Sequence, residues 1–108
     1  MKRIGYALAI AAALALAPSA QAQRSSDPSR AILAAVADPA RPAADVARDA
    51  DRHPAQITAF AGVRPGQRIA ELAPGGGYYT RILARSVGPR GHVYAVVSPG
   101  FAQRPGAL

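Results

Sequence analysis

Three consecutive glycines, Gly75 to Gly77, form the segment of this 108-residue sequence in which chemistry is easiest to expect. They follow a short segment that ends just after Glu71, and they precede a helix-forming segment that begins at Tyr78. A backbone without side chains can turn sharply, and a ligand can then approach the amide groups at the positive end of the helix. The first turn of a doubly wound α/β sheet binds nucleotide-like cofactors in this way. The sequence therefore predicts a cofactor-binding loop.

The glycine pattern differs from the one that binds dinucleotides. The pattern Gly-x-Gly-x-x-Gly would place its last glycine where this sequence has Thr80. The acidic residue that contacts the ribose, about 20 residues further on in that pattern, falls near Val97 and Ser98, and neither is acidic. These differences disfavour an NAD-type site.

Turn signals divide the second half of the chain into a strand, a loop, a helix and a second strand. Pro65-Gly66 fits a tight turn before a short strand over Arg68–Leu72. A helix is predicted over Tyr78–Val87, with packing positions at Tyr79, Ile82, Leu83 and Val87. His92–Val97 is rich in β-forming residues and apolar enough to be a strand buried on both faces. This order predicts one βαβ unit with parallel strands and a right-handed crossover.

The segment before this unit is predicted to be helical. Ser29–Ala37 has apolar residues at helical spacing. Asp45–Asp51 is polar and compatible with a helix. Residues of like charge follow one another at a spacing of four from within this stretch, and such pairs do not stabilise an isolated helix, so other parts of the protein must stabilise it. A further helix is predicted from Pro54 to Ala61, with Ile57 and Phe60 pointing inward.

The first 22 residues have the features of a signal peptide. Two basic residues precede Ile4–Leu16, which is apolar apart from Gly5 and Tyr6 and is shorter than the roughly 20 residues that span a bilayer. Ala20-Gln21-Ala22 supplies small residues at a cleavage site. We expect cleavage after Ala22, export to the periplasm or the medium, and no membrane association of the cleaved chain.

The predicted organisation is a signal peptide (1–22), a helical lead-in (23–62), a βαβ unit with its glycine loop (63–97) and an irregular tail (98–108). The predicted fold class is α/β, as the N-terminal portion of a Rossmann-like doubly wound parallel sheet. The sheet is expected to be incomplete, because such a domain has about six strands. Two strands leave sheet edges unpaired, so a partner chain or self-association is expected to cover them.

Charge and composition disfavour nucleic-acid binding, which stays a weak alternative, and they also disfavour a metal site. Lys and Arg number 13 against 6 Asp and Glu, but the arginines are scattered, which is not typical of a nucleic-acid-binding segment. The sequence has no cysteine, and His53 and His92 lack a pattern of further ligands, so no metal site is predicted.

The run Glu71-Leu-Ala-Pro-Gly-Gly-Gly77 fits the pattern Glu-x-Gly-x-Gly-x-Gly, and here the sequence resembles the class I S-adenosylmethionine-dependent methyltransferases. It is similar to exported members that carry runs like Arg48-Asp-Ala-Asp-Arg-His-Pro54, Phe60-Ala-Gly-Val63 and Pro74-Gly-Gly-Gly-Tyr-Tyr-Thr80. Gly62–Ala95 also looks like the cofactor half of protein isoaspartate and tRNA adenine methyltransferases. The resemblance covers roughly residues 42–97, which is the front of that family's domain.

The resemblance implies S-adenosyl-L-methionine as the cofactor and assigns roles to six residues. Glu71 would hold the methionine end of the cofactor, through its amino group or a water. Gly75 and Gly77 match motif glycines whose backbones pass close to the cofactor, and Ala73 stands where the first motif glycine belongs. The full cofactor-binding set is Glu71, Ala73, Gly75, Gly76, Gly77 and Tyr78. The family's acid for the ribose has no counterpart, because Glu71 is the last carboxylate side chain in the sequence.

Each assignment has a structural alternative. Glu71 can instead cap the following helix or pair with an arginine, and the glycines can form a tight turn without a ligand. Asp49 and Arg52 fit either a position over the cofactor cleft or a role on the surface. Two functions therefore stay open: a methyltransferase of unknown acceptor and unknown catalytic residues, and a non-catalytic exported binding or assembly module, or truncated pseudo-enzyme.

Overall fold

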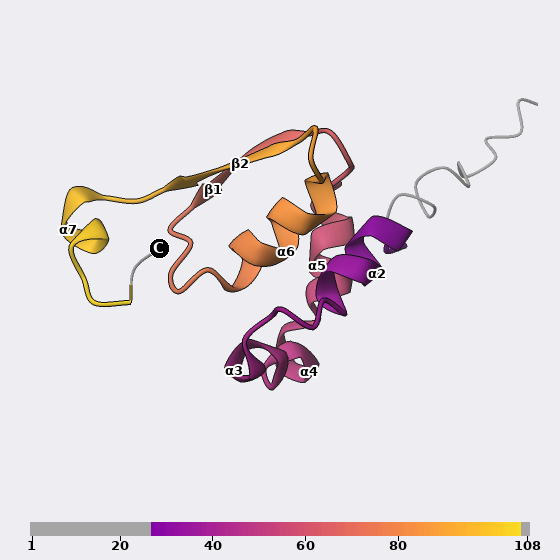
Figure 1. Ribbon diagram of the computed structural model, residues 1–108, viewed down its shortest axis with the longest axis horizontal. Helices are drawn as coiled ribbons and strands as arrows, with labels where there is room; N and C mark the ends of the chain where they lie inside the picture. The colour runs from indigo at the N-terminus through magenta and orange to yellow at the C-terminus, as the bar shows by residue number, and fades with distance from the viewer. Residues whose placement is uncertain (1–26, 107–108) are drawn as a thin grey trace, which may run out of the picture.

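The computed structural model describes residues 27–106 (Figure 1). The predicted signal peptide, residues 1–22, lies outside this range. None of the helices within residues 27–106 has the length and apolar character needed to cross a membrane.

Two parallel strands and the helix between them form the centre of the structure. β1 (Arg68–Leu72) pairs with β2 (His92–Val96) in a register that runs from Arg68 opposite His92 to Leu72 opposite Val96. α6 (Tyr78–Val87) connects the strands and packs against β2. The strands and helix lie where the sequence predicted them, and the predicted α/β class is confirmed. The arrangement is consistent with part of a Rossmann-like α/β domain.

The lead-in covers the side of α6 that faces away from the strands (Figure 1). α2 (Arg30–Val36) packs directly on α6 and begins at Ser29, whose hydroxyl accepts a hydrogen bond from the amide of Ile32. Ala35 of α2 joins Tyr78 and Ile82 of α6 in the buried core. α2 also packs against α5 (Pro54–Phe60). α6 therefore lies between the lead-in and the sheet.

The polar stretch before α5, which the sequence showed to be compatible with a helix, forms two short helical turns. These are α3 (Ala43–Val46) and α4 (Asp49–Arg52). The expectation that other parts of the protein stabilise this stretch is confirmed, because Asp45 and Asp49 form ion pairs with Arg81 and Arg41.

The predicted inward side of α5 is wrong. Ile57 and Phe60 are 49% and 85% exposed, whereas Thr58 and Ala59 are buried. Residues three apart share one side of a helix, and α5 is rotated so that this side faces solvent. Its smaller side chains are therefore the ones that pack inward.

The prediction that the second strand is buried on both faces is also wrong. Tyr94 and Val96 are 41% and 46% exposed, and Leu72, opposite Val96 in the register, is 76% exposed. Residues two apart in a strand share a face, so these three side chains lie on the same open face of the sheet. α6 packs against the strands from the opposite side, and within residues 27–106 the sheet has two strands.

The tail after β2 is more ordered than predicted. α7 (Pro99–Ala102) forms a single helical turn there, with Pro99 in its first position. The hydroxyl of Ser98 accepts a hydrogen bond from the amide of Phe101 at 3.3 Å, which caps this turn.

Candidate functional site

The glycine loop reverses the chain between β1 and α6 through left-handed backbone conformations. Gly75 and Gly77 have φ angles of +62° and +85°, which glycine adopts without steric cost. Ala73 has a φ angle of +54°, a conformation that costs an ordinary residue about 1–2 kcal/mol. The amide of Gly77 donates to the carbonyl of Pro74 at 3.1 Å and closes the turn. The backbone thus has the sharp turn that the sequence predicted.

Free space lies in front of this loop. A Cβ atom added at Gly75 or Gly76 would meet no atom of the described residues within 4 Å. Gly77 is the N-cap of α6, and no side chain within residues 27–106 caps this helix end. Amide groups at an uncapped helix N-terminus attract negatively charged groups. The loop can therefore admit a ligand with a carboxylate or similar anionic group.

Glu71 lies beside the loop and is half-buried. The hydroxyl of Thr80, in the first turn of α6, donates to Glu71 Oε2 at 2.6 Å. The side chain also lines a cleft of about 460 Å³ together with Ile69 and Leu83. Glu71 is therefore tied to the beginning of α6, and its contact with Thr80 engages one of the two carboxylate oxygens.

Tyr78 lies in the core although the resemblance placed it in the cofactor-binding set. It is 5% exposed, and its ring packs with Ala35 and Ile82. Tyr79 also packs partly buried against this core, as its helical spacing predicted. The Tyr78 hydroxyl donates to Asp49 Oδ1 at 2.5 Å. Through this hydrogen bond the first residue of α6 is attached to α4.

Arg41 completes this attachment, and sequence reasoning did not single it out. Its side chain is 2% exposed, and its guanidinium donates to both carboxylate oxygens of Asp49 at 2.7 and 2.8 Å. It also donates to the carbonyl of Val36 at 2.6 Å. The like-charge spacing in the Asp45–Asp51 stretch was the available signal, because it indicated that other parts of the protein had to stabilise this stretch.

Charge and burial shift the ionisation of these three groups. Hydrogen bonds from Arg41 lower the pKa of Asp49 below its ordinary value, and the Tyr78 hydroxyl acts in the same direction. Burial, together with Asp49, raises the pKa of Tyr78 to about 12. The hydrogen bonds to Asp49 raise the pKa of Arg41. At neutral pH the network consists of the Arg41–Asp49 ion pair and the neutral phenol of Tyr78. The guanidinium of Arg52 also lies over the Tyr78 ring, 4.6 Å from its centre.

Within residues 27–106, neither a ribose-binding carboxylate after β2 nor a metal-binding cluster accompanies the glycine loop. After β2, the hydroxyl of Ser98 caps α7. No Asp or Glu follows Glu71 in the sequence, so no carboxylate side chain is available at the end of β2 to hold a ribose. Within the described range, no three His, Cys, Asp or Glu side chains converge on a position for a metal ion.

A parallel βαβ unit with a glycine loop after its first strand is the arrangement by which doubly wound α/β proteins bind mononucleotide-like groups. No family model matches the sequence, and no solved structure matches it. A stretch of 51 residues, 46% of the chain, is 37% identical to protein-L-isoaspartate O-methyltransferase from Ignicoccus hospitalis. The match covers 24% of that protein, so the chain corresponds to about a quarter of the length of this curated relative. This is a partial relationship to a methyltransferase.

Proposed function

We propose that the chain binds S-adenosyl-L-methionine in its glycine loop and forms the cofactor-binding front of a methyltransferase-like domain. The observation that carries the proposal is the open glycine loop at the uncapped beginning of α6, with a carboxylate beside it. The sequence pattern from Glu71 to Gly77 and the partial identity to protein-L-isoaspartate O-methyltransferase support the same cofactor class.

The charges around the loop complement the methionine end of this cofactor. The amide groups at the beginning of α6 suit its carboxylate, and the Glu71 carboxylate suits its ammonium group. Gly75 and Gly76 leave room for the ligand to approach the backbone. The bound cofactor would supply a methyl group on a positively charged sulfur, and the chain would contribute binding and orientation. The adenosine would be held without a carboxylate from the end of β2.

A non-catalytic binding or assembly module is the second candidate. The contact between Thr80 and Glu71 favours it, because a carboxylate that tethers a helix needs no ligand. In that case Glu71 and the loop serve only to join β1 to α6. The two candidates differ in one measurable property, which is affinity for the cofactor.

Calorimetric titration of the chain with S-adenosyl-L-methionine tests the proposal. We expect binding, and we expect Glu71→Gln to weaken it about 10-fold or more, since a hydrogen bond to a charged group contributes about 1.5–3 kcal/mol. Asp51→Asn is the matched control, because Asp51 is an exposed carboxylate on α4. No heat at millimolar cofactor would refute cofactor binding and leave the module as the function. Equal affinity of the Glu71 variant and the wild type would show that Glu71 does not bind the cofactor.

Export after cleavage following Ala22 belongs to the same proposal. The mass of the protein recovered from a bacterial periplasm should correspond to a chain that begins at Gln23. A recovered protein that retains Met1 would refute cleavage.

A further inference from the structure

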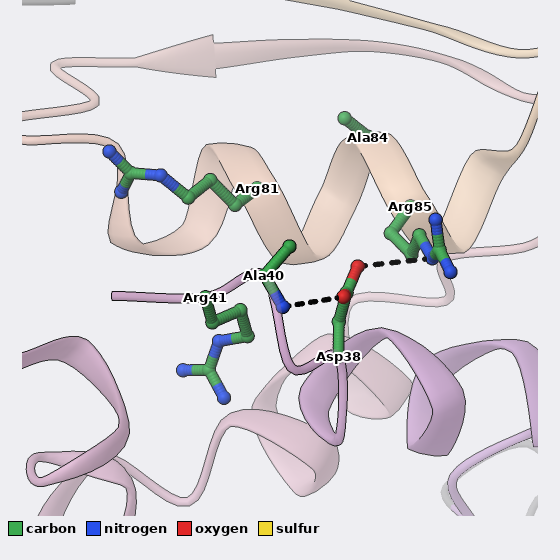
Figure 2. A pocket seen from close by; sticks show the side chains of 6 residues that line it. All are labelled: Asp38, Ala40, Arg41, Arg81, Ala84 and Arg85. Atoms are coloured by element: carbon green, nitrogen blue, oxygen red, sulfur yellow. Dashed lines mark hydrogen bonds and ion pairs between the residues drawn. The ribbon is translucent and has the colours of Figure 1, made fainter. Parts of the chain in front are cut away.

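Two arginines of α6 form similar ion pairs with the lead-in. Arg81 Nη1 lies 3.0 Å from Asp45 Oδ2, and Arg85 Nε lies 3.2 Å from Asp38 Oδ2. Both arginines line a cleft of about 380 Å³ beside α6. Figure 2 shows Arg81 extending along the helix away from Arg85, while Asp38 reaches Arg85. The two pairs therefore join the same helix to the same lead-in at different places.

Arg81 has an additional contact that Arg85 lacks within the described residues. Its Nη1 also donates to the carbonyl oxygen of Gly76 at 3.0 Å. The Asp45 side chain is 13% exposed, against 38% for Arg81, so the more buried carboxylate anchors the more exposed guanidinium. One nitrogen thus connects α3 to the middle of the glycine loop.

This contact restrains a single peptide group. The carbonyl of the Gly76–Gly77 peptide accepts from Arg81, and the amide of the same peptide donates to the carbonyl of Pro74 at 3.1 Å. A peptide group held at both its oxygen and its nitrogen cannot flip without breaking both hydrogen bonds. Glycine has the widest choice of backbone conformations, so this restraint matters more here than it would at another residue.

We propose that Arg81, oriented by Asp45, is a positioning residue that holds the Gly76–Gly77 peptide in the orientation that keeps the glycine loop open to its ligand. The inference rests on the proposed function for the identity of the ligand. It makes the lead-in a part of the cofactor site in addition to a cover for the core.

Three variants separate this role from an ordinary ion pair. Arg81→Met keeps an unbranched apolar stem like that of arginine and removes both hydrogen bonds, to Asp45 and to Gly76. Arg85→Met is the matched control, because it removes an ion pair from the same helix without touching the loop. Arg81→Lys should keep part of the restraint on the loop, since an ammonium group can donate to the oxygens of both Asp45 and Gly76. The measurements are ¹⁵N order parameters of the Gly75–Gly77 amides and calorimetric affinity for S-adenosyl-L-methionine.

We expect Arg81→Met to lower the loop order parameters from about 0.85 to below about 0.6. We expect it to weaken cofactor binding about 5- to 20-fold, since one charged hydrogen bond no longer orders the loop. Arg85→Met should leave both quantities at wild-type values, and Arg81→Lys should be intermediate. Unchanged loop order in Arg81→Met, or an equal loss in Arg85→Met, would overturn the inference.

Two further outcomes are informative. If Arg81→Met does not fold, Asp45→Asn tests the same restraint without changing α6, and it should lower the same order parameters by a smaller amount. Unchanged loop order in Asp45→Asn would then overturn the inference. If the wild type gives no heat with the cofactor while Arg81→Met loosens the loop, the proposed function is refuted and the restraint on the peptide is confirmed.

Discussion

The ion pair between Arg41 and Asp49 allows a quantitative test of how the lead-in is held to α6. In Asp49→Asn the side chain keeps its size and one acceptor oxygen but loses its negative charge. The Arg41 guanidinium, 2% exposed, then keeps its hydrogen bond to the carbonyl of Val36 and loses its counterion. The Tyr78 hydroxyl loses a charged acceptor.

The expected loss in the free energy of unfolding is about 2–3 kcal/mol. Removing one partner of a buried ion pair costs about 3–5 kcal/mol. The loss here is smaller because the Asp49 side chain is 22% exposed and the new amide still accepts one hydrogen bond. For a domain of this size each 1 kcal/mol shifts the melting temperature by about 4–8 °C. The variant should therefore melt roughly 10–20 °C below the wild type.

Urea denaturation followed by far-ultraviolet circular dichroism is the assay, with Asp51→Asn as the control. Asp51 lies in the same short helix as Asp49 and is exposed, so its substitution should change stability by less than about 0.5 kcal/mol. If Asp49→Asn is as stable as Asp51→Asn, the buried pair does not stabilise the fold and the reasoning is wrong.

The pH dependence gives an independent check on the same pair. Hydrogen bonds from Arg41 lower the pKa of Asp49 in the folded protein below its ordinary value of 3.8. The folded state therefore favours the charged carboxylate, so this contribution to stability is complete above about pH 5 and is lost as the pH falls through 3.8 and below. Asp49→Asn should lose stability less steeply in this acidic range. Equal acid slopes in the variant and the wild type would contradict the assignment.

Three further predictions follow from single residues. Burial holds the pKa of Tyr78 at about 12 against an ordinary 10.0, so stability should fall between pH 10 and 12, and Tyr78→Phe should flatten that fall. Gly91→Ala should lower the free energy of unfolding by about 1–3 kcal/mol, because the added Cβ would lie 2.7 Å from the carbonyl oxygen of Gln67. Gly100→Ala is the control: its added Cβ meets open space, so it should leave the thermal melt unchanged. Ala73→Gly should stabilise the chain by up to about 1 kcal/mol in urea denaturation by removing the strain of its positive φ, and a destabilised variant would contradict that strain.

The positions of the helices and strands could be predicted because glycine and proline punctuate the sequence. Pro65-Gly66 forms the turn before β1, and Gly88-Pro89 stops α6 before β2. These residues act through local backbone preferences, so no tertiary information is needed. The glycine loop was predictable for the same reason.

Burial and long-range pairing could not be predicted in the same way. The rotation of α5 that exposes Ile57 and Phe60 depends on which side meets α2, and periodicity alone does not give that side. Arg41 went unnoticed because Asp49 lies eight residues away and Tyr78 lies in a different element. The like charges in the polar stretch indicated that a partner existed without saying which one.

Because α6 lies between the lead-in and the sheet, the lead-in and the βαβ unit should unfold together. Separating the lead-in would open Ile82 and Tyr78 to water, and it would also break the links of α6 to α3 and α4. A single cut in the exposed connection between α5 and β1 would therefore leave two pieces that stay associated. They would be digested together once α6 unfolds, with no resistant fragment accumulating.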